Sequence, residues 1–290
     1  MHYPRNYKKY PDVTKIKDYV YDETIGNYGK ADLFYVKGKE KYPVIVNVHG
    51  GGFVKGDKRH RSAICSEYAR EGFFVYNVNY RLAPQYPLPC GSIDVLTALS
   101  RLPALAKQYG LDLTKVVLTG DSAGAFYAAS ATLALVNPDY AALLGVDDPD
   151  VVDKPSVVPT AFMGFCGAYR LGDILSRKTP FNVADDIAAS LMGVKCGSSL
   201  RPEECEKFRF TDLIKYVDEK FPKSFLLYSL HDDFCGGQGE LMEQQLLTHG
   251  VSVETFVAEG EKDIHCFHLL PGHKTTPYCM RKAKAFLRSV

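Results

Sequence analysis

A Gly-Asp-Ser-Ala-Gly segment at residues 120–124 constrains the fold most strongly, because it joins two different kinds of sequence. Residues 116–119 before it form an apolar run of the kind that fills a buried strand, and residues 125–136 after it are small and helix-favouring. Glycines two positions before and two positions after Ser122 leave no side chain where strand, turn and helix crowd together. The sequence therefore predicts a strand, a tight turn that holds Ser122, and a helix.

A serine held in such a turn is a candidate nucleophile. Its hydroxyl reacts poorly until a base lies beside it, and a helix that starts at Ser122 would direct free N–H groups and a positive dipole end at the same place. A Gly-x-Ser-x-Gly match arises by chance in roughly one in ten sequences with this length and glycine content. The surrounding sequence must therefore support the interpretation. The alternative is a glycine-flanked serine in an ordinary loop.

A second glycine cluster, His-Gly-Gly-Gly-Phe at residues 49–53, ends the apolar run at residues 43–48. Adjacent glycines let the backbone approach a ligand closely and direct N–H groups at it. We expect the N–H groups of Gly51, Gly52 and Ala123 to form an oxyanion hole. The alternative is a flexible turn after a buried strand.

Two carboxylates follow a third strand-like run, at residues 224–230. Asp232 and Asp233 come directly after it, where the active-site loops of a parallel sheet gather. Enzymes with a serine on a strand-to-helix turn have their carboxylate, and then their histidine, later in the chain. We prefer Asp232 as the acid, and Asp233 stays open.

The histidine is expected after the strand-like run at residues 251–257. His265 lies in the loop that follows, and three other histidines compete with it: His231, His268 and His273. A lone loop histidine is most often a solvated surface residue, so position alone favours His265 only weakly.

Three motifs occur in order along the chain: residues 49–53, the Tyr-Arg-Leu-Ala-Pro stretch within residues 79–89, and residues 120–124. Together they resemble the hormone-sensitive-lipase-like branch of the α/β-hydrolase carboxylesterases, with an acetyl-esterase character. The resemblance is close over residues 40–135 and continues loosely toward the C-terminus.

The resemblance implies an α/β-hydrolase fold and adds weight to two site residues. The family's acid is the first aspartate of an Asp-x-apolar turn, which Asp232 matches, and its base lies in a His-x-Phe motif, which His265 matches. The chain departs from the family at Gln85, where glutamate is usual, and its aspartate turn lacks the usual proline. Because only 48 residues precede His49, we expect no large N-terminal cap.

The pattern of the whole chain predicts a single α/β domain over residues 1–290, with a mostly parallel eight-stranded sheet and helices on both faces. The resemblance implies that the first two strands form an antiparallel edge hairpin. Strand-like runs lie near residues 17–21, 31–36, 43–48, 73–79, 115–119, 158–165, 224–230 and 251–257, and helix-like runs near residues 60–71, 92–109, 123–136, 240–249 and 278–289.

Two segments do not fit this alternation. Residues 137–159 contain an aspartate cluster without EF-hand spacing and are predicted to form a solvated loop. Residues 170–218 lie where the family inserts its lid, and their helix-like part at residues 184–192 predicts a small cap over the substrate pocket.

Composition limits the partners. A net charge of +1 without a basic block argues against nucleic acid. The first ten residues lack the apolar core of a secretory signal, and no apolar run is long enough to span a bilayer, so we expect a soluble cytoplasmic protein. The oligomeric state is left open, with a homo-oligomer among the options.

The chain has eight cysteines, and their spacing argues against a disulfide framework or a metal site. We expect reduced thiols and neither a metal nor another cofactor. Cys235 and Cys266 lie near Asp232 and His265 in the sequence, which suggests a thiol-sensitive enzyme, although small buried side chains are the simpler interpretation.

These expectations combine into a serine carboxylesterase that hydrolyses short acyl esters, acetyl to butyryl, through an acyl-enzyme formed on Ser122. Two alternatives stay open. One is an amidase, such as an arylformamidase or a small peptidase, that uses the same residues. The other is a non-catalytic binding module for small molecules.

Overall fold

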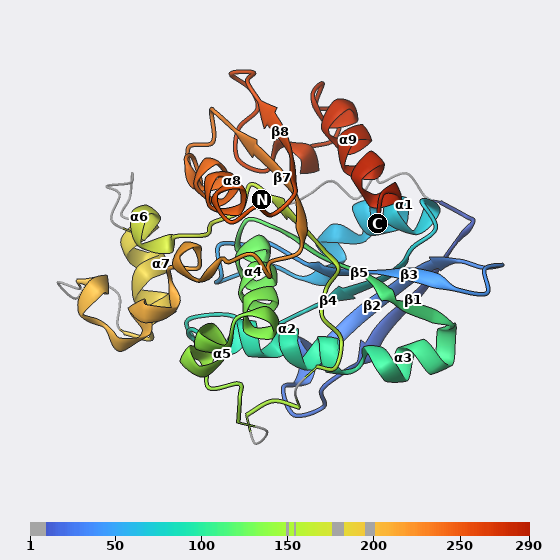
Figure 1. Ribbon diagram of the computed structural model, residues 1–290, viewed down its shortest axis with the longest axis horizontal. Coiled ribbons are helices and arrows are strands. Elements are labelled where there is room, and N and C mark those ends of the chain that lie inside the picture. The colour runs from blue at the N-terminus through green and yellow to red at the C-terminus, as the bar shows by residue number, and fades with distance from the viewer. Residues whose placement is uncertain (1–9, 149–150, 154, 176–182, 195–200) are drawn as a thin grey trace.

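The computed structural model of the protein describes residues 10–148, 151–153, 155–175, 183–194 and 201–290. An eight-stranded sheet in the order β1-β2-β4-β3-β5-β6-β7-β8 runs through its centre (Figure 1). Its strands are β1 (Val13–Val20), β2 (Lys30–Val36), β3 (Tyr42–Val48), β4 (Phe74–Val78), β5 (Leu111–Asp121), β6 (Ala161–Phe165), β7 (Lys223–Ser229) and β8 (Val253–Ala258).

The sheet is parallel from β4 to β8 and antiparallel at one edge, where β1 pairs with β2 and β2 pairs with β4. The α/β-hydrolase fold and the antiparallel hairpin predicted from the sequence are therefore confirmed. The parallel strands end in register: Val48 of β3 lies opposite Gly120 of β5, and Phe165 of β6 lies opposite Asp121. Loops from distant parts of the sequence consequently meet at one edge of the sheet.

Helices cover both faces of the sheet. Side chains alternate between the two faces along each strand, so apolar strands present apolar side chains on both. Val44, Val46 and Val48 pack with α2–α8 on one face, whereas Ile45 packs with α1 and α9 on the other. The helices are α1 (Ser62–Arg70), α2 (Cys90–Ser100), α3 (Leu102–Tyr109), α4 (Ala123–Val136), α5 (Pro138–Leu144), α6 (Leu171–Leu175), α7 (Val183–Met192), α8 (Gln238–Thr248) and α9 (Thr276–Arg288).

Short 3₁₀ helices occur in the connections. They are η1 (Gly26–Gly29), η2 (Lys58–Arg61), η4 (Pro202–Glu204), η5 (Glu206–Phe210), η6 (Ile214–Tyr216) and η7 (Phe267–Leu269). No helix of the described residues is long and apolar enough to cross a membrane.

Two predictions about helices were wrong in detail. The single helix expected at residues 92–109 is divided into α2 and α3 at Arg101, because Pro103 in the first turn of α3 has no N–H to continue the earlier helix. The loop expected at residues 137–159 begins with α5, whose N-cap Asn137 accepts a hydrogen bond from the N–H of Tyr140 and whose C-cap Gly145 is left-handed.

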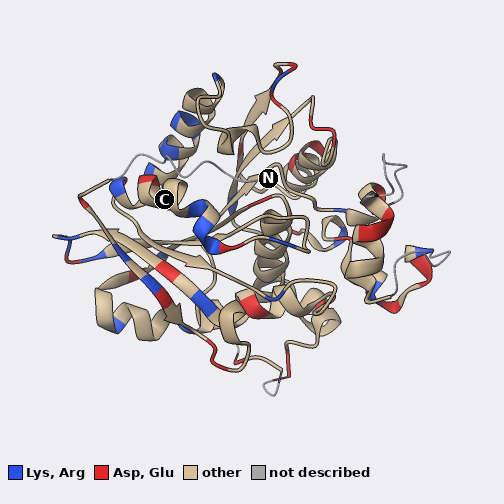
Figure 2. Ribbon diagram, turned by 180° about the vertical axis from the view of Figure 1, so that it is seen from behind, with Lys and Arg blue, Asp and Glu red and all other residues tan. Residues whose placement is uncertain are grey.

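Basic residues lie along α9 (Figure 2). Two of them connect this helix to the end of α1: Lys284 pairs with Glu67 at 3.3 Å, and Arg288 pairs with Glu71 at 2.7 Å. These pairs are partly exposed, so each contributes about 0–1 kcal/mol, and the buried apolar contacts between the helices and the sheet contribute more.

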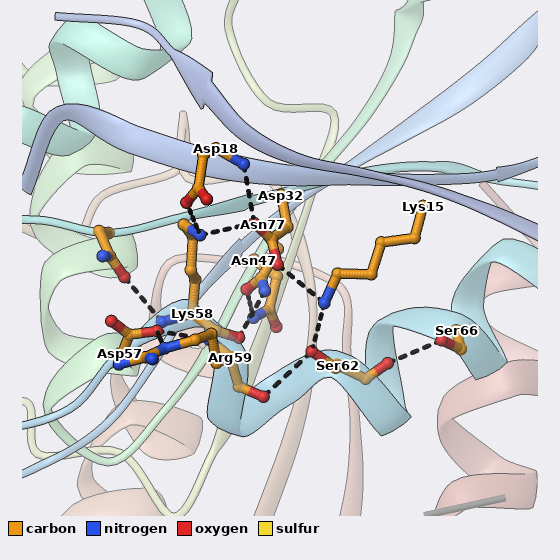
Figure 3. A network of polar contacts seen from close by, with 11 residues as sticks. Lys15, Asp18, Asp32, Asn47, Asp57, Lys58, Arg59, Ser62, Ser66 and Asn77 are labelled. Atoms are coloured by element: carbon orange, nitrogen blue, oxygen red, sulfur yellow. Dashed lines mark hydrogen bonds and ion pairs between the residues drawn. The ribbon is translucent and has the colours of Figure 1, made fainter. Parts of the chain in front are cut away.

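Lys58 of η2 lies at the centre of a buried polar network (Figure 3). Its Nζ is 2.5 Å from Oδ1 of Asp32 and 2.7 Å from Oδ1 of Asp18. Its backbone N–H donates to the side chain of Asn79, and its carbonyl accepts from the side chain of Asn77, each at 2.7 Å. The network therefore fastens η2 to both the edge hairpin and the end of β4.

Replacing the buried ammonium tests this network. We expect Lys58→Met to lower the free energy of unfolding by about 3 kcal/mol, the lower end of the range for breaking a buried pair, because Lys15 still lies 2.8 Å from Asp32. Urea denaturation measures the change. Arg59→Met is the matched control, since Arg59 is exposed and should cost at most about 1 kcal/mol. Equal losses in the two variants would contradict the assignment.

Candidate active site

Ser122 occupies the turn between β5 and α4 with φ 52° and ψ −123°, as the N-cap of α4. Two glycines make this turn sterically feasible. A Cβ on Gly120 would lie 2.4 Å from the backbone of Gly124, and a Cβ on Gly124 would lie 2.2 Å from the carbonyl oxygen of Val48. The strained serine thus depends on close backbone approach on both sides.

The structure brings the three predicted site residues together. His265 Nε2 lies 2.9 Å from Ser122 Oγ, and His265 Nδ1 lies 2.8 Å from Oδ2 of Asp232. Asp232 is buried, and its Oδ1 accepts hydrogen bonds from the N–H groups of Phe234 and Cys235 at 2.9 and 2.7 Å. A continuous hydrogen-bonded chain therefore runs from carboxylate to imidazole to serine hydroxyl.

The competing residues take no part in this hydrogen-bonded chain. Asp233 and His231 are exposed, and His273 contacts the carbonyl of Lys262 at 3.0 Å. His268 is buried and stacks on Phe165, with 5.0 Å between ring centres. Among the described residues, none of these four side chains hydrogen-bonds to the serine hydroxyl or to the carboxylate that holds the imidazole.

Burial and neighbouring groups determine the protonation of His265 and Asp232. Burial disfavours the charged imidazole of His265, whereas Cys235 and the hydrogen bond with Asp232 favour it, and the net effect raises the pKa of His265 above its ordinary value. For Asp232, the hydrogen bond with His265 outweighs burial and lowers the pKa of the carboxyl. The geometry therefore favours an ionised carboxylate beside a basic imidazole.

The glycine loop after β3 leaves several N–H groups available. Gly51 has φ 152° and lies so close to Lys55 that a Cβ would be 1.8 Å from the Lys55 carbonyl oxygen, and Gly52 is left-handed with φ 60°. In the part of the chain that the structure describes, the N–H groups of Gly51, Gly52 and Ala123 donate no hydrogen bond. All three predicted oxyanion-hole donors thus remain free to bind a ligand oxygen.

A buried ion pair lies directly behind the serine turn. Arg61 binds Asp121 with both Nε and Nη2, each at 2.5 Å, and both side chains are buried. Burial opposes ionisation of Asp121, but the Arg61 charge and hydrogen bonds outweigh it and lower the pKa of this carboxyl. Gly50 touches the pair, since a Cβ there would lie 2.4 Å from Oδ2 of Asp121. The sequence offered no signal for Arg61, because 60 residues separate it from its partner.

His49 supports the glycine loop without taking part in the hydrogen-bonded chain. Its ring stacks on Tyr80 at 4.4 Å, and its carbonyl accepts a hydrogen bond of 2.7 Å from the Tyr80 hydroxyl. Burial and the charge of Arg61 lower the pKa of His49 to about 4, so the ring is neutral at physiological pH. A neutral ring adds no positive charge beside Arg61.

Gln85, at the position where the resemblance leads us to expect glutamate, is exposed and contacts the Tyr86 hydroxyl at 3.3 Å. Arg81 of the same segment finds a carboxylate elsewhere: it pairs with the buried Asp94 of α2 at 2.6 Å. The segment is therefore anchored by Asp94, which the sequence pattern did not identify.

A small apolar cavity of about 20 Å³ adjoins Ser122. Its walls come from α6, α7, the glycine loop and the loop after β7, and include Phe53, Leu171, Ile174, Ile187 and Phe234. Helix α7 lies close to the glycine loop, since a Cβ on Gly52 would lie 3.8 Å from Cδ1 of Ile187. This volume holds about one water molecule, so the apolar space beside the serine is narrow.

Sulfur atoms lie close to the imidazole. Cys266 Sγ is 3.5 Å from His265 Nε2, and Cys235 shares a cluster with Asp232 and His265 in which the ligating atoms lie within 4.8 Å of one another. The described cysteines are all free, as expected, and Cys196 lies outside the described residues. They are Cys65, Cys90, Cys166, Cys205, Cys235, Cys266 and Cys279.

Comparisons with known proteins agree with this geometry. The family model described as BD-FAE matches residues 31–246. Esterase LipI of Mycobacterium tuberculosis is 39% identical over 88 residues, which are 30% of this chain and 28% of that protein. Lipase 2 of a Moraxella species is 32% identical over 118 residues, which are 40% of this chain and 27% of that protein. The chain thus spans little more than a quarter of the length of these curated relatives.

Solved structures extend the likeness over nearly the whole chain. Esterase B from Lactobacillus rhamnosis, in complex with an inhibitor, has a TM-score of 0.79 at 22% identity, covering 98% of this chain and 90% of that one. A bacterial heroin esterase has a TM-score of 0.73 at 22% identity, and the match covers 96% of this chain and 84% of that one. At this identity the likeness shows the shared fold. With most of its length matched by one family model, the chain belongs to the BD-FAE family, within the hormone-sensitive-lipase-like branch of the α/β-hydrolases.

Proposed function

We propose that the protein is a serine carboxylesterase that hydrolyses short-chain acyl esters, with Ser122, His265 and Asp232 as its catalytic residues. The observation that carries the proposal is the hydrogen-bonded chain from Asp232 through His265 to Ser122. The names of the relatives, an esterase and a lipase, point in the same direction.

In the acylation step, Ser122 Oγ attacks the ester carbonyl carbon while His265 Nε2 takes the hydroxyl proton. Asp232 accepts the hydrogen bond from Nδ1–H, which fixes the imidazole tautomer and stabilises the imidazolium that forms. His265 then gives its proton to the leaving alcohol as the tetrahedral intermediate collapses. The acyl group stays on Ser122 Oγ.

Three backbone donors stabilise the charge that develops on the carbonyl oxygen. The N–H groups of Gly51, Gly52 and Ala123 have no other hydrogen-bond partner among the described residues. Ala123 is also the first residue of α4, where the helix dipole favours negative charge. Deacylation repeats the sequence with water as the nucleophile, which releases the acid and restores the serine hydroxyl.

The narrow apolar cavity beside Ser122 supports a short acyl group. A volume of about 20 Å³ accepts only a group of about the size of one water molecule before its walls move, and each added methylene requires a larger movement. Helices α6 and α7, within the segment 170–218 interpreted as a lid, form a large part of those walls. We therefore assign acetyl to butyryl esters as the substrates and give the lid control over acyl length.

Substitution of the three residues tests the mechanism. Ser122→Ala and His265→Ala should each lower kcat for p-nitrophenyl acetate by at least ~10⁴-fold, because the residues act as a unit. His268→Ala is the matched control, since His268 is a neighbouring buried histidine outside the hydrogen-bonded chain, and it should lose far less. Retention of a tenth of the activity by Ser122→Ala would refute the assignment, and higher activity on a matched anilide would indicate an amidase.

The pH dependence follows from the imidazole. Only neutral His265 accepts the serine proton, so kcat/KM should rise with pH through one ionisation, and the raised pKa places this rise above the ordinary histidine value of 6.5. Asp232→Asn removes the negative charge that stabilises the imidazolium and should shift the residual profile to lower pH. An unshifted profile, with chemistry rate-limiting, would contradict the role of Asp232.

Acyl length tests the lid. We expect kcat/KM to be highest for acetyl to butyryl p-nitrophenyl esters and to fall for acyl chains of ten carbons or more. Ile187→Ala enlarges the cavity and should raise the hexanoate-to-acetate ratio by ~10-fold, because a wall of this size contributes ~1–3 kcal/mol of discrimination. Asp185→Ala, on the exposed side of the same helix, should leave the ratio unchanged. A maximum at ten carbons or more would overturn the short-acyl assignment.

A further inference from the structure

Three side chains that the proposed mechanism does not use gather behind the imidazole: Cys166, Cys266 and His268. Their ligating atoms lie within 4.8 Å of one another. All three residues are buried, with exposed fractions of 1%, 8% and 6%. Both cysteines have left-handed backbones, with φ 47° at Cys166 and φ 55° at Cys266, a conformation that non-glycine residues rarely adopt. The loops after β6 and β8 therefore adopt unusual turns where the two sulfurs approach each other.

The imidazole of His268 provides a second, independent observation. Its Nδ1 is buried and has no hydrogen-bond partner among the described residues. The ring is held by stacking on Phe165, with 5.0 Å between centres and 29° between planes. A buried ring nitrogen without a partner is costly, and a ligand that accepts its lone pair removes that cost.

We propose that Cys166, Cys266 and His268 form a binding site for a thiophilic cation with a filled d shell, with Zn²⁺ as the reference ion. Two sulfurs and one imidazole nitrogen are the ligands that such ions prefer. With metal–sulfur distances of about 2.3 Å and metal–nitrogen distances of about 2.0 Å, tetrahedral ligand atoms lie about 3.5–3.8 Å apart. The three donor atoms need only small movements to reach this geometry.

The ion replaces the thiol protons, because metal binding requires thiolates and therefore releases protons. His268 also lines a separate groove of about 610 Å³ between α1 and α9, with Ile64 and Met280 among its walls. Ser122 is not among the residues that line this groove, so His268 borders a space other than the cavity beside the serine.

A cation at this site would inhibit the proposed esterase. Cys266 Sγ lies 3.5 Å from His265 Nε2, the nitrogen assigned to take the serine proton. A positive ion bound to that sulfur repels the positive charge of the imidazolium that forms in each step. Binding of the ion also moves Cys266, which directly follows His265 in the chain. This consequence rests on the proposed function, whereas binding of the ion does not.

Direct binding measurements on the full chain test the site without relying on turnover. After treatment with a chelator and a non-thiol reductant, the protein is titrated with Cd²⁺, whose bonds to thiolates give an ultraviolet charge-transfer band, and with Zn²⁺ by calorimetry. We expect one ion per chain. Cys166→Ala and His268→Phe should each weaken binding by roughly 100-fold or more, since each removes one of three ligands.

Two control variants locate the ion. Cys65→Ala removes a buried thiol of α1 in the same apolar core and should leave binding unchanged. Cys235→Ala should also leave it unchanged, because Cys235 belongs to the cluster with Asp232 and His265. Circular dichroism tests whether each variant is folded. If Cys166→Ala is not folded, Cys166→Ser replaces it.

The proposal is overturned if the chain binds no Cd²⁺ at millimolar concentration, if Cys166→Ala binds as the parent does, or if Cys235→Ala abolishes binding. Inhibition of p-nitrophenyl acetate hydrolysis by Zn²⁺, lost in Cys166→Ala, would support the predicted consequence. If the protein hydrolyses no ester, the binding measurements still decide whether the metal site exists.

Discussion

The buried ion pair between Arg61 and Asp121 connects the parts of the site that must be placed most accurately. Asp121 precedes the serine, and Arg61 ends the 3₁₀ helix η2 that follows the glycine loop. Gly50 packs against the Asp121 carboxylate so closely that no side chain fits there. Because a buried charge without its partner is costly, the pair holds the serine turn and the glycine loop in one arrangement.

That arrangement depends in turn on the edge hairpin. Lys58, three residues before Arg61, is bound by Asp32 of β2, and its backbone is bound by asparagines at the end of β4. The antiparallel edge therefore does more than extend the sheet. It fixes the position of η2 and therefore the position of Arg61, which pairs with Asp121.

The opposite side of the serine is assembled differently. Asp232 and His265 follow β7 and β8, and their loops are held by short local hydrogen bonds, such as those from the N–H groups of Phe234 and Cys235 to Asp232. Behind them lie sulfur atoms and a stacked histidine instead of a charged network. The proposed base, His265, therefore has polarisable, metal-binding groups beside it, whereas the nucleophile Ser122 directly follows a residue of a buried ion pair.

Motifs read along the chain were sufficient to predict the α/β class and the eight strands, because buried strands and glycine turns leave local signals, whereas the antiparallel edge was implied by the family resemblance. The same local signals selected Ser122 and favoured Asp232 and His265, and the family resemblance strengthened the choice over Asp233 and His268. The division of the helix at Arg101 and the helix α5 were missed, even though Pro103, Asn137 and Gly145 were visible signs of them.

Tertiary structure alone decided the contacts between residues far apart in sequence. Arg61 meets Asp121 across 60 positions of the chain, and Cys166 meets Cys266 across 100. Neither pair has a characteristic spacing, because each forms where strands in register bring two distant segments to the same edge of the sheet. Local sequence determines what each loop contains, and the order and register of the strands determine which loops meet.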